Sequence, residues 1–268
     1  LIPLVSNFDS IVIIGFSNTS YILSNFSSDT RFDKISYNLK VTSASSAAYS
    51  VAAFIFTSEK FRQNMSQIAF AETAYYDAII SNYFNKITNN KFPEKKIVSG
   101  NLVERLRYGE NPHQKAAIYS INKKLNIKQL HGKQLSYNNY NDIFSALLIS
   151  KSMPKNTGTV IVKHANPCGV SINKNKFNSF KLALACDPTS AFGGIVSCNF
   201  NINKKLALEL RKIFLEVIIC NGIKKDALKI LKNKKNLRII DASKLNNNNL
   251  NSVSTLFNNF LIQTKDIF

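Results

Sequence analysis

The spacing of apolar residues changes along the chain, and its first part predicts one strand followed by a loop. Residues 11–15 form a short run of β-branched side chains that ends in glycine, which predicts a buried strand. Residues 17–29 are rich in serine and asparagine, which predicts a surface loop.

A helical period begins at Thr42 and is sustained over residues 59–87, which predicts a long amphipathic helix. Its apolar positions, three and four residues apart, are Phe61, Met65, Ile68, Ala69, Ala74, Tyr75, Ile79 and Tyr83. A polar stretch ending at Pro93 closes the helix. The expected domains are therefore residues 1–93 and 94–268.

After Pro93 the two periods alternate, which predicts an α/β layer architecture. The expected strands cover residues 103–108, 116–119, 159–163, 195–198, 217–220 and 237–240. The expected helices cover residues 142–152, 177–186, 204–214 and 225–232. The strand over residues 159–163 is expected to run into a loop at Asn166-Pro167.

Composition indicates a folded protein. Of its 268 residues, 45% are hydrophobic and 19% are charged, and the mean hydropathy is -0.09. No apolar run approaches the roughly 18 residues that a membrane span needs, so we do not expect the chain to be an integral membrane protein. The four cysteines are widely spaced without a CxxC pair, and the opening residues LIPLV lack the basic region and cleavage site of a signal peptide, so we expect reduced thiols and a cytoplasmic location.

The formal charge of +19 raises the hypothesis of a basic nucleic-acid-binding module. Lysine greatly outnumbers arginine, asparagine is abundant and tryptophan is absent, which is the composition that an AT-rich coding bias produces. Specific nucleic-acid readers favour arginine for bidentate base contacts. We therefore expect no nucleic-acid partner. The alternative, a basic face that binds nucleic acid, predicts binding that weakens steeply with salt.

Lys163 and His164 stand where a buried strand is expected to end at a sheet edge. A neutral histidine beside a cation can accept a proton, while the lysine stabilises a developing negative charge. The alternative is a lysine that ends a strand and a histidine that bonds to a backbone carbonyl. Spacing alone leaves both interpretations open.

Two polar turns follow apolar elements and are further candidates. Residues 107–114 read RYGENPHQ, in which Arg107 could hold a phosphate or carboxylate and Tyr108 could stack on a base. Residues 187–194 read DPTSAFGG, whose glycines permit close approach of a ligand, although a plain turn would look the same.

Several familiar sites have no counterpart in the sequence. There is no GxxxxGK[ST] phosphate loop and no GxGxxG after a strand. The three histidines have no partners at metal-ligand spacing, and Pro167-Cys168 lacks the second cysteine of a zinc deaminase. We therefore expect no metal.

The motifs taken together resemble one family. RYGENPHQ at 107–114, LSYNN at 135–139, KHANPCG at 163–169, DPTSAFGG at 187–194 and EVII at 216–219 are collinear. They resemble the bifunctional purine-biosynthesis family that combines AICAR transformylase (phosphoribosylaminoimidazolecarboxamide formyltransferase) with IMP cyclohydrolase. The resemblance runs over nearly the whole chain.

The resemblance implies an activity and a set of site residues. The family's transformylase moves a formyl group from the cosubstrate 10-formyltetrahydrofolate to the amino group of AICAR. Its catalytic lysine and histidine match Lys163 and His164. Its substrate-contacting positions match Arg107, Tyr108, Asn139, Gly193 and Glu216.

The resemblance also implies which parts of the family's fold the chain contains. Residues 94–268 would form the first cytidine-deaminase-like layer of the transformylase, and residues 1–93 the tail of a methylglyoxal-synthase-like cyclohydrolase domain. Ser6 stands where the family has a catalytic lysine, so cyclohydrolase activity is expected to be lost by substitution and by truncation. By the same resemblance, the family's second transformylase layer is missing after Phe268.

Two interpretations follow for the chain as it stands. One is a part of a formyltransferase that is active only with its missing half, with AICAR and folate as small-molecule partners. The alternative is a non-catalytic remnant that still dimerises. Because the family's sites lie at a subunit interface, a homodimer is the expected assembly in either case.

Overall fold

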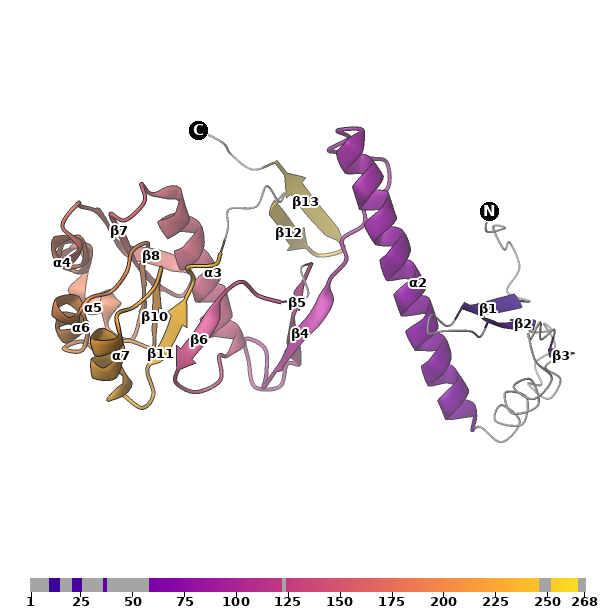
Figure 1. The fold of residues 1–268 in the computed structure, drawn as a ribbon, viewed down its shortest axis with the longest axis horizontal. Coiled ribbons are helices and arrows are strands. Elements are labelled where there is room, and N and C mark those ends of the chain that lie inside the picture. The colour runs from indigo at the N-terminus through magenta and orange to yellow at the C-terminus, as the bar shows by residue number, and fades with distance from the viewer. Residues whose placement is uncertain are drawn as a thin grey trace. The chain divides into compact units, whose positions relative to one another are not determined.

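The computed structural model describes residues 10–14, 21–25, 36–37, 58–121, 124–245 and 252–264. The chain forms two compact units, Leu1–Ser99 and Gly100–Phe268 (Figure 1). The division falls after Ser99, whereas the polar stretch predicted a boundary after Pro93.

A small antiparallel sheet opens the first unit. Its strands, in the spatial order β1-β2-β3, are β1 (Ser10–Ile14), β2 (Tyr21–Asn25) and β3 (Ser36–Tyr37). β1 confirms the strand expected at residues 11–15, but the loop expected over residues 17–29 is wrong in its middle, where β2 pairs with β1. The Tyr-Ile-Leu run of β2 favours extended pairing, which outweighs the turn preference of the flanking polar residues. The helical spacing between Thr42 and Ser58 lies outside the described residues.

The long helix α2 (Glu59–Ile87) confirms the helix predicted from the apolar spacing. Ser58 caps its first turn by accepting a hydrogen bond from the N–H of Phe61, and Thr88 ends it by donating to the carbonyl of Phe84. Ala78 is its one buried residue, so most of the expected apolar positions remain exposed. Among the described helices, none is long and apolar enough to cross a membrane.

A six-stranded mixed sheet forms the centre of the second unit, which confirms the α/β class. Its order is β6-β11-β10-β9-β7-β8. The strands are β6 (Lys128–His131), β7 (Gly158–Lys163), β8 (Asn166–Ile172), β9 (Ile195–Cys198), β10 (Val217–Cys220) and β11 (Arg238–Asp241). β9, β10 and β11 are parallel, while β7 runs antiparallel to β9 and to β8, and β6 runs antiparallel to β11.

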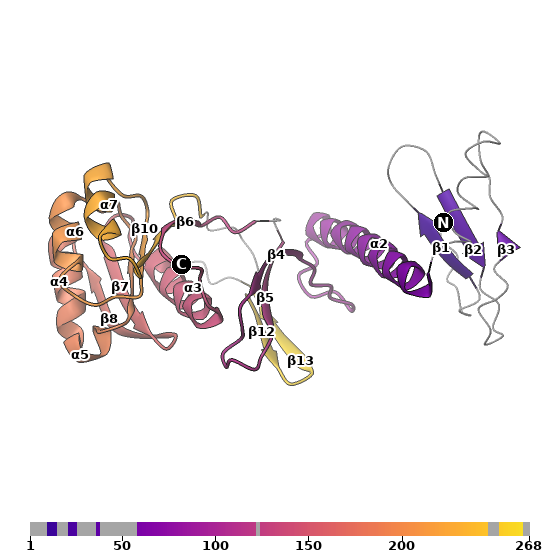
Figure 2. The same cartoon turned by 90° about the horizontal axis from the view of Figure 1, so that it is seen from below.

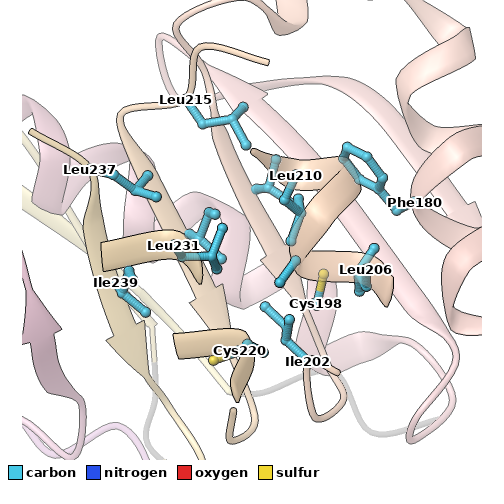
Figure 3. Close-up of a cluster of buried hydrophobic side chains, with 14 of the residues drawn as sticks. Phe180, Cys198, Ile202, Leu206, Leu210, Leu215, Cys220, Leu231, Leu237 and Ile239 are labelled. Atoms are coloured by element: carbon cyan, nitrogen blue, oxygen red, sulfur yellow. The ribbon is translucent and has the colours of Figure 1, made fainter. Parts of the chain in front are cut away.

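Helices cover both faces of this sheet (Figure 2). α4 (Lys176–Cys186), α6 (Lys204–Leu210) and α7 (Lys225–Lys232) lie on one face, and α3 (Tyr137–Ser152) lies on the other. The strands alternate between the two cores as their pleat requires: Ile161 of β7 packs under α4, α6 and α7, while Val160 and Val162 pack under α3. Figure 3 shows the first of these cores, where leucines from α6 and α7 meet Cys198 and Cys220 of the sheet.

α3, β8 and α6 are among the elements of this unit that differ from the sequence prediction. α3 begins at Tyr137 rather than at residue 142, because Ser136 and Asn139 form a capping box that starts the helix earlier. The loop expected at Asn166-Pro167 is wrong, since β8 begins there and forms an edge strand that tolerates proline. α6 ends at Leu210, short of the expected residue 214.

Smaller elements complete the unit. β4 (Asn101–Leu106) pairs with β5 (Ala116–Ser120), and β12 (Ser252–Leu256) pairs with β13 (Asn259–Gln263), both antiparallel. α5 (Pro188–Ala191) is a single helical turn that replaces the plain turn expected within residues 187–194. The sequence patterns predicted neither β6 nor β12.

Gly169 makes the contact between β8 and α4 possible. A β-carbon at this position would overlap the carbonyl oxygen of Ala183. We expect Gly169→Ala to lower the free energy of unfolding by about 1–3 kcal/mol, because backbone must move to relieve the overlap. Urea unfolding followed by circular dichroism measures this change. Val170→Ala, at an exposed position of the same strand, is the control, and equal losses in the two variants would contradict the close-packing explanation.

Candidate functional site

Residues that are far apart in the chain meet along one edge of the central sheet. This edge is formed by the ends of β7, β9, β10 and β11, not by an outer strand. Because β7 runs opposite to β9, its carboxyl end at Lys163 lies with the amino ends of β9, β10 and β11. Gly193 precedes β9, Glu216 precedes β10 and Arg238 begins β11. The predicted lysine-histidine pair and two predicted substrate positions therefore share one sheet edge.

His164 lies in a two-residue hairpin turn that links β7 to β8. Lys163 pairs with Asn166, and the residues between them, His164 and Ala165, have φ angles of 56° and 60°. Two successive positive φ angles are the pattern of a type I′ hairpin turn, which usually contains glycine or asparagine. The His164 side chain is exposed, so it is free to meet a ligand at this edge.

Helix α3 holds this turn from one side. The carboxylate of Asp142 accepts a hydrogen bond from the N–H of Ala165 at 2.6 Å, and the hydroxyl of Ser145 donates to the carbonyl of Ala165 at 2.6 Å. The Asn166 amide donates to the carbonyl of His164 at 3.0 Å. Both polar backbone groups of Ala165 are thus fixed by one helix.

Lys163 lies beside the glycine loop. Its ammonium donates to the carbonyl of Phe192 at 2.7 Å, and a β-carbon at Gly193 would lie 3.9 Å from that nitrogen. Gly193 has a φ of +75° and donates its N–H to the carbonyl of Phe214, so the loop needs glycine here. An open hollow of about 300 Å³ adjoins the pair and is lined by Lys163, His164, Asn166, Pro167, Cys168 and Ser190.

Asn139 and Glu216 form the second part of the site. The Asn139 amide donates to the Glu216 carboxylate at 3.0 Å, and Asn139 is buried and also completes the capping box of α3. The nearest guanidinium nitrogen of Arg238 lies 3.9 Å from the same carboxylate. This arrangement fixes a negative charge at the sheet edge between an amide and a cation.

Arg107 and Tyr108 follow β4 and belong to a separate turn. The Arg107 guanidinium lies 5.7 Å from the centre of the Tyr108 ring, and Gly109 and Gln114 close the turn with a backbone hydrogen bond of 2.9 Å. The Asn138 amide donates to the carbonyl of Glu110 at 3.5 Å, which ties the turn to the start of α3. The described contacts connect this turn to Lys163 and His164 only through α3.

A second hollow lies beside this turn. It measures about 380 Å³ and is lined by Gly109, Glu110, Gln114, Lys115, Ala116 and Tyr137. Tyr137 is the first residue of α3, so this second hollow borders the amino-terminal end of that helix, whereas the residues that line the first hollow all lie outside α3.

Comparison with known proteins identifies the family. Residues 43–268 match the family model described as the AICARFT/IMPCHase bienzyme. The chain belongs to this family.

Curated relatives in the AICARFT/IMPCHase family carry the name bifunctional purine biosynthesis protein PurH. The protein from Oceanobacillus iheyensis is 42% identical over 77% of this chain and 42% of its own length. The protein from Rhizobium meliloti is 42% identical over 77% of this chain and 40% of its own length. The protein from Prochlorococcus marinus is 43% identical over 78% of this chain and 43% of its own length. The chain thus spans about two fifths of the length of the relatives it matches.

Membership of the AICARFT/IMPCHase family confirms the resemblance drawn from the motifs. The family model is named for two enzymes, a formyltransferase and a cyclohydrolase. In the described ranges, no group of three His, Cys, Asp or Glu side chains could hold a metal ion.

Three residues of the site were not predicted from the sequence: Asp142, Ser145 and Arg238. Asp142 follows Asn139 by three positions, so helical spacing could have placed both on one side of α3. Arg238 begins the strand next to β10, but nothing in its local sequence indicates the contact with Glu216. Within the described part of the chain, the Nε atom of Arg238 is buried without a hydrogen-bond partner.

Three ionisable groups near the hairpin turn have shifted pKa values. The pKa of the Asp142 carboxyl is raised, chiefly by burial and also by Glu216, while the Ala165 N–H and His164 oppose the rise. Burial likewise raises the pKa of the Cys168 thiol. Hydrogen bonds from Ser190 lower the pKa of Asp187, which caps α5 beside the hollow.

Asn139 has two roles whose loss should be measurable together. We expect Asn139→Ala to lower the free energy of unfolding by about 1–3 kcal/mol, because it removes half of a capping box and leaves the Glu216 carboxylate without its amide donor. Thermal unfolding followed by calorimetry tests this. Asn141→Ala, on the exposed side of the same helix, is the control, and an equal loss there would refute the role of the buried contact.

Proposed function

We propose that this chain contributes the AICAR-binding half of a formyltransferase in purine biosynthesis. The observation that carries the proposal is the meeting of Lys163, His164 and Gly193 at one sheet edge in a member of the AICARFT/IMPCHase family. The resemblance of the motifs to those of the family supports a catalytic role for Lys163 and His164 and a substrate-contacting role for Gly193.

The proposed reaction transfers a formyl group from 10-formyltetrahydrofolate to the amino group of AICAR. The amine nitrogen attacks the formyl carbon, and His164 accepts the proton that the amine loses. Lys163 stabilises the tetrahedral oxyanion or donates a proton to the folate nitrogen as its bond to the formyl carbon breaks. The products are formylated AICAR and tetrahydrofolate.

The geometry is suited to these roles. The Lys163 ammonium uses one N–H on the Phe192 carbonyl, which aims the group and leaves two donors for a ligand. His164 is exposed on a turn that α3 holds rigid.

The remaining predicted site residues would hold AICAR. Arg107 supplies a guanidinium that matches a phosphate, and Tyr108 supplies a ring on which a base can stack. Asn139 and Glu216 offer a fixed amide and carboxylate to polar groups of the substrate. Gly193 allows a ligand to approach the backbone beside Lys163.

As part of the same proposal, we assign a specific fold to each of the two units. Residues 100–268 would be the first cytidine-deaminase-like layer of the transformylase, and residues 1–99 a methylglyoxal-synthase-like tail of the cyclohydrolase. Ser6 in place of the family's lysine supports the loss of cyclohydrolase activity. A cytoplasmic homodimer is the assembly that we propose.

Calorimetric titration with AICAR tests the proposal. We expect the chain to bind AICAR, and both Lys163→Ala and Arg107→Ala to weaken binding about tenfold or more, because each removes a charge-assisted contact. Titration with the unphosphorylated nucleoside separates the two residues, since Arg107→Ala should cost it less than it costs AICAR. Measurements at two salt concentrations identify nonspecific attraction by the basic surface.

Lys155→Ala is the matched control, because Lys155 is an exposed lysine before the start of β7, at the opposite edge of the sheet. Its effect on AICAR affinity should stay within about twofold. If the unmodified chain binds no AICAR, or all three variants lose affinity equally, the formyltransferase proposal fails. The non-catalytic dimerising remnant would then be the better interpretation.

A further inference from the structure

We propose that Asp142 is a positioning residue for His164: its carboxylate accepts from the Ala165 N–H and so holds the His164–Ala165 turn in its left-handed conformation. The inference rests on the proposed function only in giving His164 the role of proton acceptor. The contacts themselves are independent of any substrate.

The turn needs an external restraint. Left-handed backbone is unfavourable for residues that carry a β-carbon, and the two positions of this turn are histidine and alanine. The residues that usually form a type I′ turn, asparagine and glycine, are absent from both positions. The sequence of the turn therefore does not explain its conformation.

Helix α3 supplies that restraint through two side chains one turn apart. Asp142 accepts from the Ala165 N–H at 2.6 Å, and Ser145 donates to the Ala165 carbonyl at 2.6 Å. A hydrogen bond to an ionised carboxylate is stronger than one between neutral groups, so Asp142 is the stronger of the two contacts. α3 is itself fixed against the sheet by Ile143, Ala146 and Leu147, which are buried.

The same carboxylate is bound to the backbone of the turn that carries His164. Lys163, the last residue of β7, precedes His164, so a proton accepted by the ring would add a second positive charge to this turn. A carboxylate fixed on the same turn favours that charge, and in return His164 opposes the rise in the pKa of Asp142 whereas Glu216 adds to it.

Ionised Asp142 is unfavourable for stability. Its pKa is raised in the folded chain, so the ionised form costs stability as the pH rises above the ordinary value of 3.8, and the cost disappears below that value. We expect Asp142→Asn to be no less stable than the unmodified chain at pH 7, and its advantage to shrink towards pH 4. A residue kept only for stability would show the opposite result.

Nuclear magnetic resonance of the full chain tests the positioning role directly. We expect the Ala165 amide proton to report the titration of Asp142 in the acid range, since it donates to that carboxylate. In Asp142→Asn this step should vanish. An Ala165 amide that shows no such step, or a step that persists in Asp142→Asn, would overturn the proposal.

Amide hydrogen exchange at Ala165 separates the hydrogen bond from the charge. We expect Asp142→Ala to speed this exchange about tenfold or more, while Asp142→Asn keeps an acceptor oxygen and stays within about threefold. Asn141→Ala is the matched control on the exposed side of α3. Equal exchange in Asp142→Ala and the control would show that Asp142 does not hold the turn.

Addition of AICAR distinguishes this inference from the proposed function. If the resonances of His164 shift with AICAR in the unmodified chain and shift less in Asp142→Ala, both proposals stand. If AICAR shifts nothing while the titration and exchange results are as expected, the positioning role stands and the formyltransferase proposal fails.

Discussion

The direction of β7 is the constraint on which the second unit depends. Had β7 run parallel to β9, its last residues would lie at the far edge of the sheet, away from Gly193, Glu216 and Arg238. Antiparallel pairing of β7 with β9 brings Lys163 to the amino ends of three parallel strands. No local property of the lysine-histidine pair could produce this arrangement.

Helix α3 joins the packing of the unit to its chemistry. One side buries Tyr140, Ile143, Ala146 and Leu147 against the sheet. The same first two turns present Asn139 to Glu216 and Asp142 to the hairpin turn. Displacement of this helix would disturb both halves of the site at once, so formation of the site is coupled to formation of the core.

Much of the fold could be predicted from the sequence because its core strands are continuous apolar runs. β10 and α7 have the predicted bounds, since each is bordered by clear polar residues. β8 was missed because Pro167 and Gly169 are typical of turns, and only its place at the sheet edge makes them acceptable. The motifs identified Lys163, His164 and Gly193. They did not identify Asp142 or Ser145, because these side chains bond to the backbone of Ala165, which lies beyond β7 in the sequence.

The course of the chain also determines which helix ends face the site. α4, α6 and α7 all run towards this edge and end there, whereas α3 begins there and ends near Asn221 and Ala242 at the opposite edge. Helix dipoles place partial negative charge at carboxyl ends and partial positive charge at amino ends. Of these four helices, three turn a negative end and one a positive end towards this edge, which is the reverse of a phosphate site built from helix amino termini. A phosphorylated ligand at this edge would be held by individual cationic side chains and by the first turn of α3. Substitution of those side chains could therefore change which anions the edge accepts.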